Sequence, residues 1–203
     1  MNYYSQYGQD RYLLEEIFPN KNDGYYVDIG AHDGVSLSNT KRLEEIGWDG
    51  VCIEPHPKRF QELLHNRSCL CYNIAISDKN DILDFLCVEG YPQMLSGVLE
   101  NYDQRHLQRI ENEINSYGGN KEIIKVHSRR FSDIIDRENI DYVSIDVEGS
   151  ELNILRSIDF DRHNIKCFSI ENAYGSDELN MFLVERGYSI INSMGCDIFF
   201  IKE

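Results

Sequence analysis

The sequence contains few basic residues and no long apolar run. Its 20 lysines and arginines stand against 35 aspartates and glutamates, which gives a formal net charge of −15. Nucleic acids and anionic membranes are disfavoured as partners, because phosphate groups are bound mainly by clustered Lys and Arg. No stretch approaches the roughly 20 apolar residues of a membrane span, and the first residues carry neither the basic nor the apolar part of a signal peptide. We therefore expect a cytoplasmic protein that needs no membrane partner.

The six cysteines form no C-x-x-C pair, and most of them lie inside apolar runs. We interpret them as buried thiols in a reducing compartment rather than as disulfides or zinc ligands. Proline is also scarce, with four residues, and no low-complexity stretch or linker interrupts the chain. With 41% hydrophobic residues over 203 positions, general disorder is excluded and a single domain over residues 1–203 is expected.

Short apolar runs alternate with amphipathic stretches, which is the pattern of βαβ units and of one doubly wound α/β sheet. The runs that predict strands are residues 25–29, 50–54, 70–74, 82–88, 121–126, 141–146 and 166–170, followed by an antiparallel pair at 188–192 and 197–202. The predicted helices are residues 9–18, 37–46, 57–65, 99–116, 131–137, 150–158 and 176–186. The longest insertion between strands, residues 89–119, is the candidate lid over an acceptor site.

A glycine-containing loop follows the first predicted strand. Asp28, Gly30 and Gly34 are spaced as D-x-G-x-x-x-G, between a strand and a helix. The dinucleotide pattern G-x-G-x-x-G is not met, because His32 stands at the second glycine position and no glycine follows at position 35. The loop instead resembles motif I of class I S-adenosylmethionine (SAM) methyltransferases, although an ordinary strand-to-helix turn would have the same glycines.

Two later strand ends fit a cofactor with an adenosine group. Glu54 closes the second strand 20 residues after Gly34, which is the separation expected for an acid that binds ribose hydroxyls. The third strand ends near Ala75 and Asp78, where class I methyltransferases hold the adenine. A plain polar turn explains Asp78 equally well, so both interpretations stay open.

Four blocks together resemble the FkbM-type methyltransferase family: residues 5–10, residues 27–34, the pair Glu54-Pro55 and residues 146–151. The resemblance implies a Rossmann-like class I fold with a mostly parallel seven-stranded sheet and an antiparallel C-terminal strand pair. It also implies SAM as the methyl donor and a hydroxyl acceptor, often on a sugar or glycan. The cofactor-binding residues that it implies are Gln9, Asp28, Gly30, His32, Glu54, Ala75 and Asp78.

A sugar hydroxyl has a pKa far above neutrality, so its methylation needs a general base, a metal ion or both. Asp146 ends one predicted strand, and Glu171 and Asn172 end the next. Their oxygens are ligands that suit Mg²⁺ or Mn²⁺, and they predict a metal site if the two strands are neighbours. The alternative is that Asp146 binds backbone N–H groups and that Glu171 and Asn172 lie in a solvated loop.

The candidate catalytic residues are Asp146, Glu148 and His127. Glu148 lies close to Asp146, and repulsion between the two carboxylates favours a base, although a structural loop acid is an equal alternative. His127 ends a strand, whereas His65, His106 and His163 lie in polar surroundings and are expected at the surface. The competing functions are O-methylation of another hydroxylated small molecule and a catalytically silent SAM-fold binding module. The oligomeric state stays open.

Overall fold

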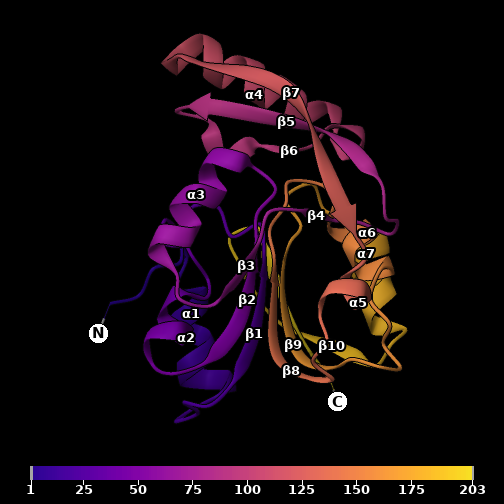
Figure 1. Ribbon diagram of the computed structural model, residues 1–203. Coiled ribbons are helices and arrows are strands. Elements are labelled where there is room, and N and C mark those ends of the chain that lie inside the picture. The colour runs from indigo at the N-terminus through magenta and orange to yellow at the C-terminus, as the bar shows by residue number, and fades with distance from the viewer. Residues whose placement is uncertain (1, 203) are drawn as a thin grey trace.

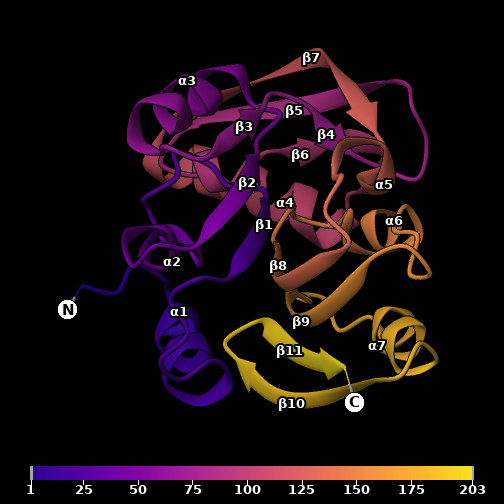
Figure 2. The same ribbon diagram turned by 60° about the horizontal axis from the view of Figure 1, so that its bottom comes forward.

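The computed structural model describes residues 2–202 and is built around a seven-stranded sheet (Figure 1). Its strands are β1 (Tyr25–Ile29), β2 (Asp49–Ile53), β3 (Leu70–Tyr72), β8 (Asn139–Ile145), β9 (Asn164–Glu171), β10 (Tyr188–Met194) and β11 (Asp197–Lys202). They lie in the order β10-β11-β9-β8-β1-β2-β3, which can be followed in Figure 2. β11 runs antiparallel to both β10 and β9, and the other neighbouring strands of this sheet pair in parallel. The predicted mostly parallel sheet with an antiparallel C-terminal pair is confirmed.

Helices cover both faces of this sheet. The short helix α1 (Gln9–Tyr12) continues as a π-helix, η1 (Leu13–Ile17), and lies with α2 (Lys41–Glu45) and α3 (Pro57–Asn66) on one face. On the other face are α5 (Phe131–Ile134), α6 (Glu151–Arg156) and α7 (Asp177–Val184). None of the helices in residues 2–202 is long and apolar enough to cross a membrane.

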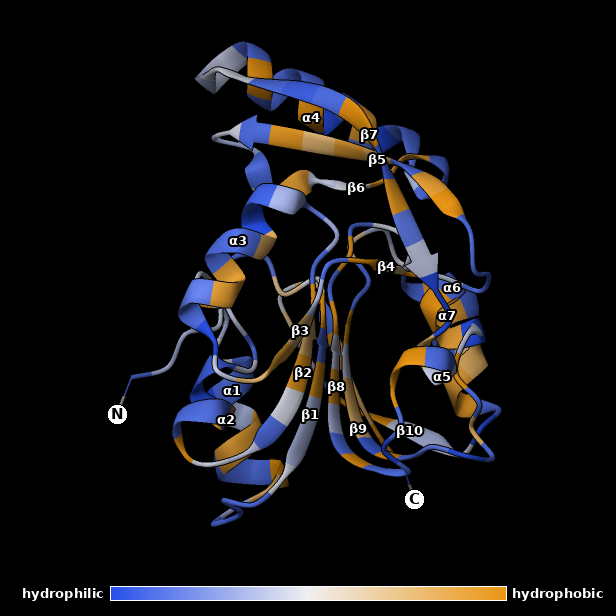
Figure 3. Ribbon diagram, viewed as in Figure 1, coloured by the Kyte–Doolittle hydropathy of each residue, from blue (hydrophilic) through white to orange (hydrophobic). Residues whose placement is uncertain are grey.

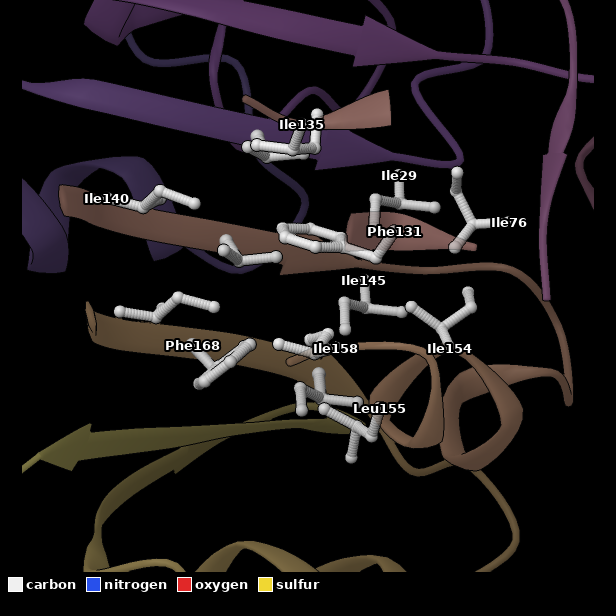
Figure 4. Packing of buried hydrophobic residues seen from close by; sticks show 14 of the residues in the cluster. Ile29, Ile76, Phe131, Ile135, Ile140, Ile145, Ile154, Leu155, Ile158 and Phe168 are labelled. Atoms are coloured by element: carbon white, nitrogen blue, oxygen red, sulfur yellow. The ribbon is translucent and has the colours of Figure 1, made fainter. Parts of the chain in front are cut away.

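The two faces have separate hydrophobic cores because successive strand residues point to opposite sides. Val27 and Ile29 of β1 join the larger core with α5, α6 and α7. Figure 4 shows Ile29, Phe131 and Ile154 in that core. Tyr26 belongs to the second core, which packs against α2 and α3. The same alternation places Asp28 beside Tyr26, on the second face, at the end of the strand.

A second sheet of four strands is inserted between β3 and β8. Its strands β4 (Ala75–Ile76), β5 (Ile82–Gly90), β6 (Gly97–Val98) and β7 (Gly119–Arg129) lie in the order β4-β7-β5-β6. The expectation that residues 82–88 and 121–126 belong to the main sheet is therefore wrong. The reason is a long antiparallel ladder, from Ile82 opposite His127 to Gly90 opposite Gly119, which pairs these two strands with each other.

The insertion also contains two 3₁₀ turns, η2 (Gln93–Leu95) and η3 (Leu99–Asn101), and the helix α4 (Gln104–Tyr117). The helix begins later than the predicted residue 99 because the Asp103 side chain accepts a hydrogen bond from the Arg105 amide at 2.7 Å and caps its first turn. Figure 3 shows a largely apolar β5 beneath a mostly polar α4. Leu86, Val88 and Ile110 form a small core between them.

A buried arginine joins the elements on the α1–α3 face. Arg67, just after α3, donates hydrogen bonds to the Tyr26 hydroxyl at 2.7 Å, the Thr40 hydroxyl at 3.0 Å and the Gly34 carbonyl at 3.2 Å. Its Nε also pairs with the Glu44 carboxylate. The Arg67 side chain has no exposed surface, and that of Glu44 is 14% exposed. One guanidinium therefore links β1, the loop after it, α2 and α3.

Replacing Arg67 should destabilise the protein strongly. We expect Arg67→Ala to lower the free energy of unfolding by about 3–5 kcal/mol, because the substitution leaves the carboxylate of Glu44 without its buried partner. Urea unfolding followed by circular dichroism measures the change. Arg11→Ala is the control, since Arg11 and Glu15 form an exposed i,i+4 pair that should contribute little. Equal losses in the two variants would contradict the role of Arg67.

Candidate active site

A cavity opens at the carboxyl ends of the main-sheet strands, where α/β sheets generally bind ligands. The tips of β1, β2, β8 and β9 form its floor, and residues 93–98 of the inserted segment form part of its wall. It lies where the strand order reverses, between β1 and β8. The sequence-predicted residues that line it are Gln9, Asp28, Gly30, His32, Glu54, Ala75, Asp146, Glu148 and Glu171.

Both glycines of the loop are needed for contacts within the protein. Gly30 has φ +89°, and a Cβ atom there would lie 1.8 Å from the carbonyl oxygen of Asp146. Gly34 has φ +80°, and its Cβ would meet Leu63 and Arg67 at 2.6 and 2.7 Å. The loop is thus compressed between β8 on one side and α3 on the other. These contacts within the protein already require glycine at both positions, without any ligand.

Glu54 organises the loop from the tip of β2. Its two carboxylate oxygens accept the backbone N–H groups of His32 at 2.8 Å and of His56 at 2.7 Å. Burial raises the pKa of Glu54, and the two N–H donors oppose that rise. His32 itself has a left-handed backbone, with φ +50°. Within residues 2–202, the buried ring nitrogens of His32 and His56 make no hydrogen bond, although His32 Nδ1 lies 3.7 Å from Asp33 Oδ1 and His56 Nε2 lies 3.7 Å from Glu89 Oε1.

Of the other predicted cofactor-binding residues, Asp28, Gln9 and Ala75 line the cavity and Asp78 does not. The carboxylate of Asp28 accepts a hydrogen bond from the Thr40 hydroxyl at 2.6 Å, and Gln9 donates from Nε2 to Asp197 at 2.9 Å. Ala75 lies in the cavity wall as predicted. Asp78 does not, because β4 ends at Ile76 and the chain turns outward, which leaves Asp78 exposed and bonded to its neighbour Ser77.

Three carboxylates gather at the tips of β8 and β9. Oxygens of Asp146, Glu148 and Glu171 all lie within 4.8 Å of one another. The Asp146 side chain is accessible from the cavity, and the surrounding protein atoms keep its carboxylate in a largely buried environment. Burial, together with repulsion from Asp197 and Glu151, raises the pKa of Asp146 to about 7. Burial and the neighbouring Asp146 likewise raise the pKa of Glu148 and bring that of Glu171 to about 11.

Two predicted residues lie outside this cluster. Asn172 follows Glu171, but its amide oxygen accepts the Ser176 N–H at 2.7 Å and its amide nitrogen donates to the Ser176 carbonyl at 3.2 Å. The side chain closes the turn before α7, and the ligand role of Asn172 stays a prediction. His127 is exposed on β7 and does not line the cavity, because β7 pairs with β5 in the second sheet.

Sequence reasoning missed His106, which was expected at the surface. It is fully buried on α4, with Nδ1 3.3 Å from Glu148 Oε2 and 3.1 Å from the Tyr174 hydroxyl. Its Nε2 lies 3.1 Å from the Leu95 carbonyl oxygen. The spacing to the buried Ile110, four residues on, is the signal that could have placed both on the inner face of the helix. His106 connects the inserted segment to the carboxylate cluster.

The strand order, the antiparallel last strand and the position of the cavity define a class I methyltransferase fold. A family model described as the methyltransferase FkbM domain matches residues 28–190. The chain therefore belongs to the FkbM methyltransferase family.

Solved structures provide the fold comparison. A crystal structure of methyltransferase FkbM from Methylobacillus flagellatus KT has a TM-score of 0.59 at 15% identity and covers 95% of this chain. This chain spans 47% of that protein, or about half its length. A TehB-like SAM-dependent methyltransferase from Corynebacterium glutamicum has a TM-score of 0.47 at 12% identity, over 97% of this chain and 88% of that one. No curated protein matches the sequence.

The contact at Gly30 predicts a severe effect of the smallest possible substitution. Gly30→Ala should lower the free energy of unfolding by about 3 kcal/mol or more, because the new methyl group would overlap the Asp146 carbonyl. Gly175→Ala is the matched control: Gly175 also has a positive φ, of 72°, but nothing lies within 4 Å of its Cβ position. Backbone strain alone should cost the control about 1–2 kcal/mol. Urea unfolding of both variants tests the difference, and equal losses would show that the overlap is relieved at no cost.

Proposed function

We propose that this protein is a SAM-dependent O-methyltransferase that acts on a hydroxyl group of a sugar or glycan. The observation that carries the proposal is that two groups of residues line one cavity. The first part of the lining is the glycine loop with Glu54, and the second part is the cluster of Asp146, Glu148 and Glu171.

The first part suits SAM by charge and by unused hydrogen-bonding groups. Asp28 and Glu54 bring negative charge to a cavity that would receive a cationic sulfonium. Glu54 would accept the ribose hydroxyls, and Ala75 would lie along the adenine. The ring nitrogens of His32 and His56, which lack hydrogen bonds within the described chain, border the same space. When bound, SAM supplies a methyl group on a sulfur atom that is a good leaving group.

The second part would prepare the acceptor hydroxyl. Asp146 is the carboxylate exposed to the cavity, and its raised pKa, about 7, suits a group that takes up the hydroxyl proton near neutrality. In the alternative arrangement, Asp146, Glu148 and Glu171 would together hold Mg²⁺ or Mn²⁺ in place of a proton, because three crowded carboxylates repel one another until a cation neutralises them. A divalent cation there would supply Lewis acidity toward the hydroxyl.

The composition of the cavity favours a neutral acceptor with several hydroxyl groups over a phosphorylated one. The acids in the lining are Asp28, Glu54, Asp146, Glu148, Glu171 and Asp197. Only Arg59 and Arg109 oppose them among the lining arginines and lysines, and Arg59 is already paired with Glu62 and Glu89. Tyr7 and Met94 offer partly exposed apolar surface at the cavity, which suits the C–H face of a sugar ring.

Binding of the demethylated product S-adenosylhomocysteine tests the cofactor half of the proposal. We expect Glu54→Ala to weaken binding by about 1.5–3 kcal/mol, because hydrogen bonds to a charged acceptor are lost. Glu54→Gln retains the volume and one acceptor oxygen, so its loss should be smaller. Isothermal titration calorimetry measures both, with the exposed Asp78→Ala variant as the control that should bind like the wild type. Unchanged affinity in Glu54→Ala would remove Glu54 from the cofactor site.

Transfer of a labelled methyl group from SAM to a panel of mono- and oligosaccharides tests the acceptor half. Turnover should be lost in EDTA and restored by Mg²⁺ or Mn²⁺. Asp146→Asn should reduce kcat by at least about a hundredfold, in the range of lost acid–base catalysis, while calorimetry shows nearly unchanged product affinity. Asn172→Ala should retain activity. Turnover that persists in EDTA would exclude the cation, and cofactor binding without turnover on any acceptor would favour a catalytically silent binding module.

A further inference from the structure

A cluster of three cysteines lies outside the cavity, on the face of β2 and β3 that packs toward α3. Cys52 of β2 stands directly opposite Cys71 of β3 in the parallel ladder. The Sγ atom of Cys69, just before β3, lies 3.5 Å from the Sγ atom of Cys52. Cys71 directs its thiol to the carbonyl oxygen of Cys69, also at 3.5 Å. Cys52 is buried, whereas Cys69 and Cys71 are partly accessible.

The surroundings make these thiols chemically different. The contact with the Cys52 thiol and the nearby guanidinium of Arg67 hold the pKa of Cys69 well below the usual thiol value. Burial, together with the hydrogen bond to Cys69, raises the pKa of Cys52. The other ionisable groups that face the cluster are Tyr26 and Asp28 of β1, both buried. The partly accessible Cys69 is therefore the more acidic thiol of the pair, and the buried Cys52 is the less acidic one.

We propose that Cys69 and Cys52 are an oxidisable pair, which hydrogen peroxide converts into a disulfide. The Cys69 thiolate attacks a peroxide oxygen, so an S–O bond forms, the O–O bond breaks and hydroxide leaves as water after protonation. The Cys52 sulfur then attacks the resulting sulfenic acid. Its proton leaves with the hydroxyl group as a second water, and the S–S bond forms. The two thiols lose two electrons, which the peroxide takes up.

The geometry allows the disulfide to form by approach of Cys69 to Cys52. A disulfide bond is about 2.05 Å long, so the two sulfur atoms, now 3.5 Å apart, must approach. Cys52 is held between β1 and β3 in the interior of the main sheet. Cys69 precedes the edge strand β3 and lies outside any strand or helix, so no strand ladder fixes its position as it fixes that of Cys52. The same segment carries Arg67, whose hydrogen bonds reach Gly34 and Thr40 at the glycine loop.

The experiment uses the full chain, first reduced and then exposed to hydrogen peroxide, with peptide mapping by mass spectrometry under non-reducing conditions. We expect one disulfide that links the peptides of Cys52 and Cys69, with the loss of two hydrogen atoms. Cys71→Ser is the matched control and should form the same disulfide. Cys69→Ser should form none, and Cys52→Ser should accumulate a sulfenic acid on Cys69 that dimedone traps.

A second measurement tests the thiolate independently of any disulfide. In the reduced wild type at mildly acidic pH, iodoacetamide should alkylate Cys69 at least about tenfold faster than Cys71, because only the thiolate reacts. Equal rates would overturn the proposal, as would a disulfide that includes Cys71 or an oxidised wild type without any disulfide. No methyl transfer is measured, so these outcomes are independent of the proposed catalytic function.

Discussion

The contact between Gly30 and the backbone of Asp146 is the constraint on which the rest of the site depends. The Asp146 amide donates to the Ile29 carbonyl at 3.0 Å, and its own carbonyl occupies the space where a side chain at position 30 would lie. The tips of β1 and β8 are thereby fixed together at the point where the strand order reverses. The chain continues from β1 to α2 on one face of the sheet and from β8 to α6 on the other, so segments that lead to both faces line the cavity.

Several carboxylates gather where the tips of β1 and β8 meet, and the protein stabilises their negative charges to different extents. Glu54 and Asp28 have hydrogen-bond donors in the backbone and in Thr40, so their carboxylates are partly compensated within the fold. Asp146, Glu148 and Glu171 have mainly one another, which keeps their proton affinity high. The two sets of carboxylates thus differ in how far hydrogen bonds compensate their negative charge. One set already accepts hydrogen bonds from the fold, and the other has a raised affinity for protons.

Much of the main sheet could be predicted because its strands are short apolar runs, and the acids at their ends could be predicted from the same pattern. The cavity does collect Asp28, Glu54, Asp146 and Glu171. The alternation of apolar and polar residues indicates a strand but does not indicate which sheet the strand joins. For this reason β5 and β7 were wrongly expected in the main sheet.

The outcomes at single residues have local causes. The amide of Asn172 is hydrogen-bonded to the Ser176 backbone, and His127 lies within β7, which pairs with β5 in the second sheet. Polar residues at strand ends show where a site can be, but their hydrogen bonds and their sheet decide whether they reach it. His106 shows the opposite error, since a mostly polar helix conceals one buried face.

The second sheet begins and ends at neighbouring points. Ala75 and Ile76 of β4 pair in parallel with Ser128 and Arg129 of β7, and the Ser77 amide donates to the Arg129 carbonyl at 3.0 Å. The whole insertion is thus attached through a narrow paired base, and its length is not coupled to the positions of β3 and β8. A longer or shorter insertion on the same base would change the part of the cavity wall formed by residues 93–98 without displacing β3 and β8.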